Sequence, residues 1–322
     1  MKLRIKNDKN IKIYIAGHKG MVGSAIWGEL HRRGYKNLIG KESNELDLRN
    51  QADVKKFFRL ENPAIVIDAA AKVGGILANK DYPYDFIMEN MQIQNNLIHE
   101  AYTSSVDKFI FLGSSCIYPK YAPQPLKEEY LLTDSLEPTN QWYAIAKISG
   151  VKACEALRNQ YKKDFICLMP TNLYGYKDNF DLNSSHVLPA MIMKFHNAKQ
   201  NNYESVNLWG SGAPLREFLF VNDLANAVVF SMENDLPDYL YNVGTGIDIS
   251  IKSLAQKIKN IVGFEGDIIW DSSKPDGTPR KLMDISKLKS AGWSYNTELD
   301  DGIKKTYNWF LENINRLKKN KY

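Results

Sequence analysis

IKIYIAGHKGMVG, residues 11–23, reads as a β-strand, a glycine-rich turn and the first residues of a helix. Apolar residues recur through residues 11–16 with the period of a strand, and helical spacing runs over residues 21–33, just before Gly34. The turn carries three glycines, Gly17, Gly20 and Gly23. Glycines let a backbone approach a pyrophosphate closely, and a helix N-terminus attracts its negative charge. The stretch therefore predicts a dinucleotide-binding turn, although its three-and-three glycine spacing leaves a plain tight turn as the alternative.

Strand-like and helix-like segments alternate beyond this stretch. Further strands are predicted at residues 36–39, 64–69, 108–112 and 165–169, and helices at residues 51–60, 85–102 and 143–161. Such alternation is typical of an α/β fold in which a doubly wound parallel sheet, a Rossmann sheet, has helices on both faces.

The chain is long enough for two unequal parts. We expect a dinucleotide-binding Rossmann domain over residues 1–175, with a returning segment at about 216–248. Residues 176–215 and 249–322 should form a smaller C-terminal α/β lobe that binds the substrate, with two helices in its last region. Ligand cavities in such folds lie beyond the carboxyl ends of the strands, so we expect the active site between the two parts.

The composition indicates a globular protein, because 44% of the 322 residues are apolar and 25% are charged. The formal net charge is +5, but many basic residues lie near the two ends, so no nucleic-acid partner is expected. No apolar run approaches the length of a membrane span, so no membrane partner is expected. The three cysteines lack metal-like spacing, which favours reduced thiols, a cytoplasmic location and no metal centre.

Tyr143 and Lys147 are four residues apart in a predicted helix and therefore lie on the same face of it. A nearby ammonium is expected to lower the pKa of a phenol, which makes the phenol a usable general acid at neutral pH. Ser114 and Ser115 follow the strand predicted at residues 108–112, where a hydroxyl could hold a carbonyl oxygen against that phenol. Alternatively, Tyr143 and Lys147 have no catalytic role, and the tyrosine packs in the helix interface while the lysine is solvated.

Seven blocks of the sequence together resemble the extended short-chain dehydrogenase/reductases. They are AGHKGMVG at residues 16–23, AAKVGG at 70–75, GSSCIYP at 113–119, YAIAK at 143–147, PTNLYG at 170–175, REF at 216–218 and SKPDGTPRK at 273–281. Within that family the chain is similar, from about residue 12 to residue 313, to enzymes that epimerise C3 and C5 of GDP-4-keto-6-deoxy-D-mannose and then reduce C4 with NADPH. The resemblance also implies a homodimer, joined through helices that begin near Asp85 and Tyr143.

The resemblance assigns catalytic roles to five residues. It implies that Cys116 is the base that removes the C3 and C5 protons and that His186 is the opposing acid. Tyr143 would protonate O4, Lys147 would support it and hold the nicotinamide ribose, and Ser114 would hydrogen-bond the keto oxygen. A thiol with a pKa near 8.5 and an imidazole with a pKa near 6.5 are suited to proton exchange near neutral pH. The alternatives are a buried core cysteine and a loop histidine without chemistry.

NADPH is the expected cofactor. Lys19 in the glycine turn and Lys41 after the second strand could face a 2′-phosphate, although Glu42 and Glu45 weaken this signal. The expected cofactor-binding residues are Gly17, Lys19, Gly20, Met21, Val22, Gly23, Lys41, Asp47, Leu48, Tyr143, Lys147, Pro170, Asn172, Leu173 and His186.

The expected substrate is a GDP-linked 4-keto-6-deoxy sugar, whose phosphates require cations. The residues expected to bind it are Ser114, Ser115, Cys116, Asn172, Val187, Lys194, Trp209, Arg216, Arg280 and Lys281. Arg216 could instead form a structural ion pair with Glu217. Gln141, Trp142 and Tyr176 depart from the family pattern at positions that could border the sugar, which leaves a related sugar open.

Three other functions stay open at this stage. The chain could act on a related GDP-4-keto-6-deoxy sugar such as a heptose, as a C4 reductase with or without epimerisation. It could be an NAD-linked nucleotide-sugar epimerase or dehydratase. It could also be a dinucleotide-binding sensor that has the fold without the chemistry. Proton exchange at C3 and C5 of GDP-4-keto-6-deoxy-D-mannose separates the epimerisation and reduction implied by the resemblance from these three functions.

Overall fold

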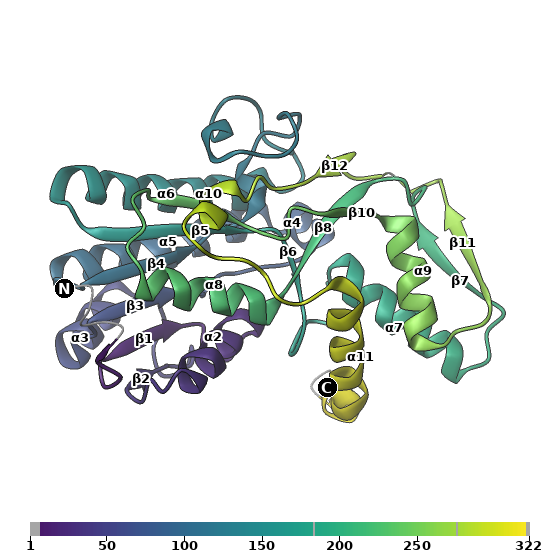
Figure 1. The fold of residues 1–322 in the computed structure, drawn as a ribbon, viewed down its shortest axis with the longest axis horizontal. Helices are drawn as coiled ribbons and strands as arrows, with labels where there is room; N and C mark the ends of the chain where they lie inside the picture. The colour runs from purple at the N-terminus through teal and green to yellow at the C-terminus, as the bar shows by residue number, and fades with distance from the viewer. Residues whose placement is uncertain (1–6, 183, 275, 320–322) are drawn as a thin grey trace.

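The computed structural model describes residues 7–182, 184–274 and 276–319. The outermost basic residues, and residue 275 of the 273–281 block, lie outside the described residues. Figure 1 shows two parts, a sheet layered with helices and a smaller lobe that contains α7, α9, β7 and β11.

A six-stranded parallel sheet forms the first part, with the strand order β2-β1-β3-β4-β5-β9. Its strands are β1 (Ile13–Ala16), β2 (Leu38–Ile39), β3 (Ile65–Asp68), β4 (Lys108–Leu112), β5 (Asp164–Pro170) and β9 (Leu240–Val243). The chain moves from β1 to β2 on one side and returns to β3 on the other, so the winding direction reverses between β1 and β3. This order is doubly wound and confirms the predicted fold class.

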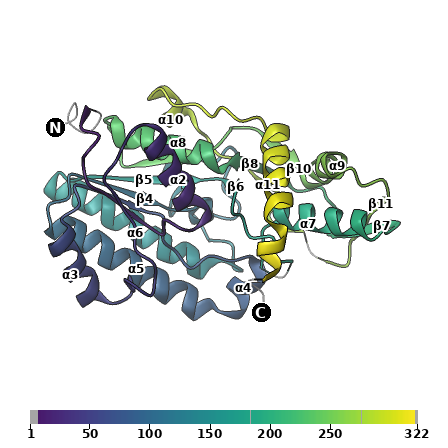
Figure 2. The same cartoon turned by 90° about the horizontal axis from the view of Figure 1, so that it is seen from below.

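Helices cover both faces of this sheet (Figure 2). One face is covered by α2 (Met21–Arg32) and α8 (Val221–Glu233), and the other by α3 (Gln51–Glu61), α5 (Pro83–Thr103) and α6 (Gln141–Tyr161). The period of two in a strand explains the division, because Ile13 and Ile15 pack in the core on the α2 side whereas Tyr14 and Ala16 pack on the α5 side. Both apolar faces are therefore buried.

The elements predicted from the sequence agree closely with these bounds. The helix predicted at residues 21–33 is α2, and Gly34 follows it with φ +86°, a left-handed conformation that favours glycine. The strand predicted at residues 36–39 is shorter, because β2 is an edge strand with only two register partners in β1.

The second part is built around its own core. Helices α7 (Val187–Gln200), α9 (Ile251–Val262) and α11 (Leu299–Lys319) pack there with the parallel pair β7 (Ser205–Trp209) and β11 (Asp267–Asp271). A second sheet joins the two parts through β6 (Asn172–Tyr174), β8 (Leu215–Phe220), β10 (Asp248–Ser250) and β12 (Arg280–Lys281). The last region holds one helix more than expected, the short α10 (Ser286–Ser290).

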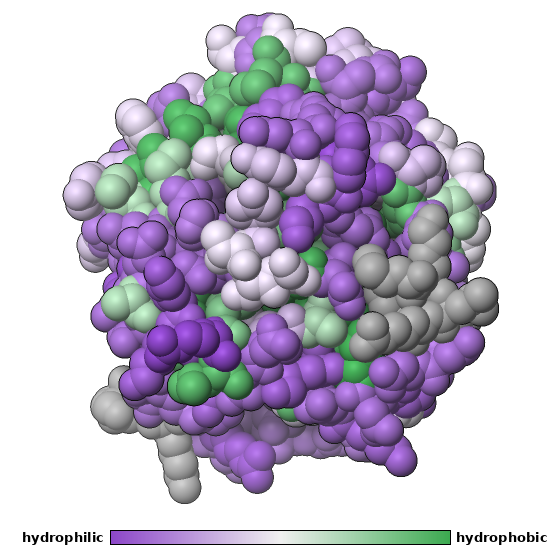
Figure 3. Space-filling view, turned by 90° about the vertical axis from the view of Figure 1, so that its left-hand side faces the viewer, coloured by the Kyte–Doolittle hydropathy of each residue, from purple (hydrophilic) through white to green (hydrophobic). Residues whose placement is uncertain are grey.

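The molecular surface is mainly hydrophilic on the side shown in Figure 3, with small apolar areas between polar side chains. Over the described residues, no helix combines the length and apolar character that crossing a membrane requires.

Glu217 connects β8 to two other segments of the chain. Its buried carboxylate accepts hydrogen bonds from the backbone N–H groups of Thr245 at 2.5 Å, Gly246 at 2.7 Å and Met283 at 2.9 Å. Burial raises the pKa of this carboxyl, and the three N–H donors oppose that effect.

Glu217→Ala is therefore expected to lower the free energy of unfolding by about 3 kcal/mol, because it leaves three backbone N–H groups without their acceptor, one of them the buried N–H of Met283. Urea denaturation monitored by circular dichroism measures this loss. The exposed Glu265→Ala is the matched control and should change stability by less than about 0.5 kcal/mol. Equal stabilities for the two variants would contradict the structural role.

Candidate active site

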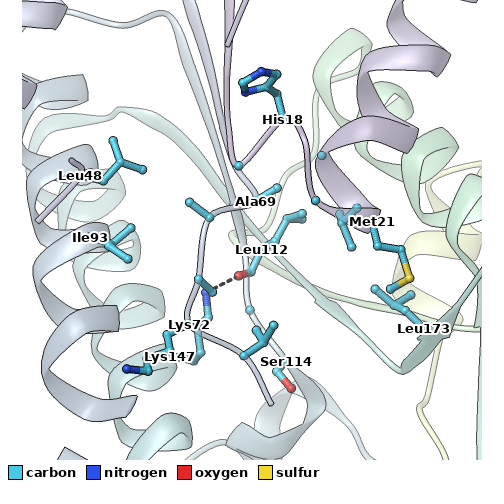
Figure 4. Close-up of a pocket in the computed structure, with 18 of the residues that line it drawn as sticks. His18, Met21, Leu48, Ala69, Lys72, Ile93, Leu112, Ser114, Lys147 and Leu173 are labelled. Carbon is cyan, nitrogen blue, oxygen red and sulfur yellow. Dashed lines mark hydrogen bonds between the residues drawn. The ribbon is translucent and has the colours of Figure 1, made fainter. Parts of the chain in front are cut away.

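A cavity of about 830 Å³ lies beyond the carboxyl ends of the sheet strands and reaches the start of α7. Every residue predicted to bind the cofactor lines it, from the glycine turn through residues 41–48 to Pro170, Asn172, Leu173 and His186. Figure 4 shows Leu48 and Ile93 on one side of this cavity and Met21 and Leu173 on the other. The predicted dinucleotide turn therefore opens onto a real cavity.

The glycine turn is close to its neighbours in space. Gly17 has φ +75°, and a Cβ at this position would lie 2.7 Å from the carbonyl oxygen of Ala69. A Cβ at Gly23 would lie 2.2 Å from the carbonyl oxygen of Gly17, so α2 can approach the turn only with glycine there. These approaches explain why positions 17 and 23 of the turn are glycine.

Charged pairs surround the end of the cavity expected to hold the adenosine. Lys19 pairs with Glu42, and Lys41 lies 3.7 Å from Glu45. Arg49 binds the carboxylate of Asp47, one of the two residues expected at the adenine edge, and holds its pKa below the ordinary value. Glu42 and Glu45 are therefore the partners of Lys19 and Lys41, and a bound 2′-phosphate would compete with these two carboxylates for the lysines.

Tyr143 and Lys147 both line the opposite end of the cavity, as their spacing on α6 predicts. The Lys147 ammonium is 5.9 Å from the centroid of the Tyr143 ring and donates a 2.9 Å hydrogen bond to the carbonyl oxygen of Leu112 (Figure 4). The expected lowering of the Tyr143 pKa is wrong for the protein alone, because burial, Cys116 and Asp68 all raise this pKa. The phenol therefore keeps its proton at neutral pH, as a proton donor must.

Cys116 is 5% exposed and does not line the cavity, whereas Ser114 and Ser115 do. The thiol lies in the short helix η1 (Ser115–Ile117), whose backbone N–H at Cys116 donates to the Ser114 hydroxyl at 3.3 Å. Burial raises the pKa of the Cys116 thiol, while the charge of Lys281 and a hydrogen bond with Ser114 act in the opposite direction. The thiol is therefore buried next to the cavity and beside a cation.

His186 is the residue before the first turn of α7 and lines the cavity. The residue is exposed in the single chain, and the partial loss of water around its imidazole lowers the pKa below the ordinary value. The imidazole is therefore neutral at pH 7, and with Cys116 as a thiol the two groups are both uncharged in the protein alone.

Two of the predicted substrate cations lie together. Arg216 on β8 and Lys281 on β12 are register partners in neighbouring parallel strands. Burial lowers the pKa of both groups, and Lys281 acts electrostatically on Arg216 and Cys116 alike. Arg216 does not pair with Glu217, because that carboxylate faces backbone donors on the other side of the strand. The structural ion pair considered for Arg216 is therefore wrong.

The other predicted substrate residues lie farther along the second lobe. Trp209 is 59% exposed at the end of β7, with the ammonium groups of Lys194 and Lys274 at 5.9 Å and 5.7 Å from its ring centroid. Arg280 forms an ion pair with Asp248 at 2.5 Å. Val187 is exposed in the first turn of α7. None of these lines the 830 Å³ cavity.

Sequence reasoning missed several residues that build the site. The loop after β3 lines the cavity with Ala69, Ala71, Lys72 and Val73, and Asp68 is buried just before it. The AAKVGG block marked this loop without giving its residues a role. Within residues 7–182, 184–274 and 276–319, no group of three or more His, Cys, Asp or Glu side chains could hold a metal ion.

Comparison with known proteins gives consistent matches. The NAD dependent epimerase/dehydratase family matches residues 13–244. GDP-L-fucose synthase 1 of Arabidopsis thaliana is 57% identical over 308 residues, which cover 96% of this chain and 95% of the relative. MlghC, a GDP-mannoheptose C4 reductase from Campylobacter jejuni solved with NADP bound, is 42% identical, has a TM-score of 0.87 and covers 94% of this chain and 99% of its own. A GDP-L-fucose synthetase from Naegleria fowleri bound to NADP is 30% identical, has a TM-score of 0.88 and covers 95% of this chain and 94% of its own.

Proposed function

The chain belongs to the NAD-dependent epimerase/dehydratase family, among the extended short-chain dehydrogenase/reductases, and from this we propose that it converts GDP-4-keto-6-deoxy-D-mannose to GDP-L-fucose. The observation that carries the proposal is the meeting of Ser114, Tyr143 and Lys147 at one end of the cavity, with Cys116 buried beside them. The high identity to a GDP-L-fucose synthase supports the choice of substrate.

NADP is the cofactor, as in the two related structures that hold it. Bound NADPH supplies the hydride that reduces C4. In this chain the backbone of the glycine turn would hold the pyrophosphate at the N-terminus of α2, and Lys147 would hold the nicotinamide ribose. Lys19 and Lys41 would face the 2′-phosphate.

Lys19→Ala combined with Lys41→Ala is expected to raise the Kd for NADPH about tenfold while leaving the Kd for NADH within about twofold. Two exposed contacts with a phosphate contribute on the order of 1.4 kcal/mol together, which corresponds to a tenfold change. Titration of nucleotide fluorescence measures both constants. The exposed Lys36→Ala, outside the cavity, is the control. An equal loss for both nucleotides would show that the lysines do not read the 2′-phosphate.

For reduction, Tyr143 donates its proton to O4 as the hydride arrives at C4. Ser114 donates a hydrogen bond to the keto oxygen and holds C4 toward the cofactor. Burial keeps the phenol protonated before the transfer. The ammonium of Lys147 then stabilises the phenolate that remains.

For epimerisation, a proton next to the keto group must leave one face of the sugar and return on the other. Removing the C3 or C5 proton leaves an enolate, whose oxygen Ser114 can stabilise. Cys116 is assigned as the base and His186 as the acid, and Lys281 favours the thiolate form of the base. For this step the Cys116 proton must first pass to His186, so that the pair reacts as thiolate and imidazolium. The thiolate then takes the carbon-bound proton, the imidazolium returns a proton to the opposite face, and the carbon is inverted.

Incubation of GDP-4-keto-6-deoxy-D-mannose with the enzyme in deuterated water tests this function. Deuterium is expected at C3 and C5 before NADPH is added, and GDP-L-fucose is expected after it is added. Mass spectrometry and NMR report the position of the label. Reduction without exchange would leave a C4 reductase, and no reaction in either stage would reject the proposed function.

Lys281→Met is expected to move the pH dependence of this exchange to higher pH by about one unit. Burial already raises the pKa of Cys116, and the Lys281 charge is the leading effect that opposes burial, so its removal raises the thiol pKa further. The exchange rate measured from pH 6 to pH 10 reports the shift. Arg280→Met is the control, because Arg280 is already paired with Asp248. Identical pH profiles for the wild type and Lys281→Met would contradict the assigned effect.

A second candidate is reduction of a GDP-4-keto-heptose. The specific observation in its favour is the similarity to a GDP-mannoheptose C4 reductase at 42% identity over 94% of this chain. A direct comparison of kcat/KM for the hexose and the heptose decides between the two.

We also propose a homodimer that buries the outer surfaces of α5 and α6. Tyr84 on α5 and Tyr161 on α6 are 71% and 47% exposed in the single chain, which supports a covering partner. Light scattering should give twice the mass of one chain, and a monomer would refute the dimer.

A further inference from the structure

Asp68 is a fully buried carboxylate at the end of β3, beside the active site. One of its oxygens, Oδ1, accepts a 3.1 Å hydrogen bond from the backbone N–H of Ala70. The other, Oδ2, is buried and has no hydrogen-bond partner among the described residues. An ionised carboxylate in such a place is costly unless another charge stabilises it.

The register of the sheet shows where that charge comes from. Asp68 pairs with Ala16 on one side and with Phe111 of β4 on the other, and it shares with Val66 the face covered by α5 and α6. The Lys147 ammonium lies over the Phe111 ring, 4.6 Å from its centroid. Asp68 on β3 and Phe111 on β4 are therefore neighbours in the sheet, and Lys147 of α6 lies over this part of the sheet, below the nicotinamide end of the cavity.

Few titratable groups face Asp68 there. Tyr14 approaches from β1, and Tyr143, Lys147 and Cys154 approach from α6. Among the groups that act on Asp68 in the described part of the chain, Lys147 is the one with a positive charge. Lys72, on the loop after β3, and Glu89, on α5, pair with each other at 2.5 Å.

Burial raises the pKa of Asp68 to about 6, and Lys147 opposes this effect. In return, Asp68 opposes the lowering of the Lys147 pKa by burial. Asp68 is therefore mainly ionised at neutral pH and helps its neighbour to stay charged.

We propose that Asp68 is a positioning residue for reduction, which acts through space to keep the Lys147 ammonium charged where its hydrogen bond to the Leu112 carbonyl oxygen holds it, below the nicotinamide. The inference rests on the proposed function, because that function gives Lys147 its task. Without the carboxylate, the largest effect that opposes burial at Lys147 is lost, so the pKa of Lys147 falls further, and the pKa of Tyr143 also falls because Asp68 raises it. Both changes mean that the charged Lys147 ammonium and the protonated Tyr143 phenol are lost at a lower pH than in the wild type.

Asp68→Asn keeps the shape and removes the charge, so it tests the proposal in the full-length enzyme. The alkaline limb of kcat for NADPH oxidation is expected to move to lower pH by about one unit. The Kd for NADPH should stay within about twofold of the wild type at pH 6 and rise at least about fivefold at pH 9, since the Lys147 charge is then lost. An unmoved limb with a uniform loss of activity at every pH would overturn the proposal and leave Asp68 a structural residue.

Asp178→Asn is the matched control, because Asp178 is another buried carboxylate with an unpartnered oxygen and Lys147 does not act on it. This variant should keep the wild-type alkaline limb and NADPH affinity. A shift equal to that of Asp68→Asn would overturn the specific role of Asp68.

Thermal denaturation gives a readout that needs no turnover. Neutral Asp68 is compatible with its buried site, so its contribution to stability is full below about pH 4 and is lost as the pH rises through about 6. Asp68→Asn should therefore have a higher Tm than the wild type at pH 8 and an equal Tm at pH 4.5. Equal values at both pH values would show that Asp68 carries no charge, which overturns the proposal.

Lys147→Met removes the positive charge that acts on Asp68, and it replaces Asp68→Asn as the test if that variant does not fold. Loss of the ammonium should move the fall in wild-type Tm near pH 6 to a higher pH, and an unchanged midpoint would overturn the pairing. If the wild type turns over no GDP-keto sugar, the proposed function fails, whereas NADPH affinity and Tm still decide the role of Asp68.

Discussion

Tyr143→Phe is expected to slow NADPH oxidation with GDP-4-keto-6-deoxy-D-mannose about 10³-fold, while deuterium exchange at C3 and C5 continues near the wild-type rate. The new alkoxide at C4 needs a proton, and the phenol of Tyr143 lies at the cavity end where Ser114 and Lys147 meet. Phe keeps the ring and its contact with Phe86, so the loss is limited to the proton donor. Exchange needs only removal and return of the protons beside the keto group, which are assigned to other residues.

The two activities are measured on one preparation of enzyme. NADPH absorbance follows reduction, and mass spectrometry of the sugar follows exchange in deuterated water without NADPH. Tyr203→Phe is a suitable control, because Tyr203 is 58% exposed and lies outside the cavity. A parallel loss of exchange and reduction in Tyr143→Phe would mean that the phenol serves both halves of the reaction.

The pH dependence of this reduction has a defined sign. Burial and two nearby groups, Cys116 and Asp68, raise the pKa of Tyr143, so the donor stays protonated through neutral pH and loses its proton only in strongly alkaline solution. The sequence predicted the opposite shift, because spacing on a helix places Lys147 beside Tyr143 but does not reveal how much water surrounds them. Desolvation depends on α5, β3 and β4, which contribute their side chains from distant parts of the chain.

The fold was largely predictable, because its information is local. The period-two run before Gly17 and the period-3.6 run after Gly20 each determine an element without help from the rest of the chain. Parallel order then follows, since each strand is separated from the next by a helix. The second lobe was less predictable, because β8 pairs with β6, β10 and β12, which come from three separate regions of the sequence.

The residues of the site also divide into those that local sequence predicts and those that depend on distant segments. Residues in contiguous motifs, such as the glycine turn and the 170–173 segment, were placed on the cavity by sequence alone. Asp68 was missed because an acid at the end of a strand has no spacing pattern, and only the register beside Phe111 brings it to Lys147. Arg280 and Lys281 look equivalent in sequence, but alternation along β12 pairs one with Asp248 and turns the other toward Cys116.

Cys116→Ser is expected to lower deuterium exchange at C3 and C5 about 10³-fold, since a hydroxyl is a much weaker source of anion than a thiol. The side chain keeps nearly the same size, and the 3.3 Å bond to Ser114 should persist because its donor is the backbone N–H of residue 116. Because burial raises the thiol pKa above its ordinary value, wild-type exchange should accelerate as the pH rises from 6 to 9, whereas the residual exchange of the variant should not follow that curve.

Cys154→Ser provides the control for this result, because Cys154 is a fully buried free cysteine on α6 that does not line the cavity. Exchange in that variant should match the wild type after correction for any loss of folded protein. Tyr143 and Lys147 are untouched in Cys116→Ser, so any NADPH that it oxidises should yield a sugar without deuterium at C3 or C5. Full exchange in Cys116→Ser would mean that the thiol, which is absent from the cavity lining, is a packing residue and that another group removes these protons.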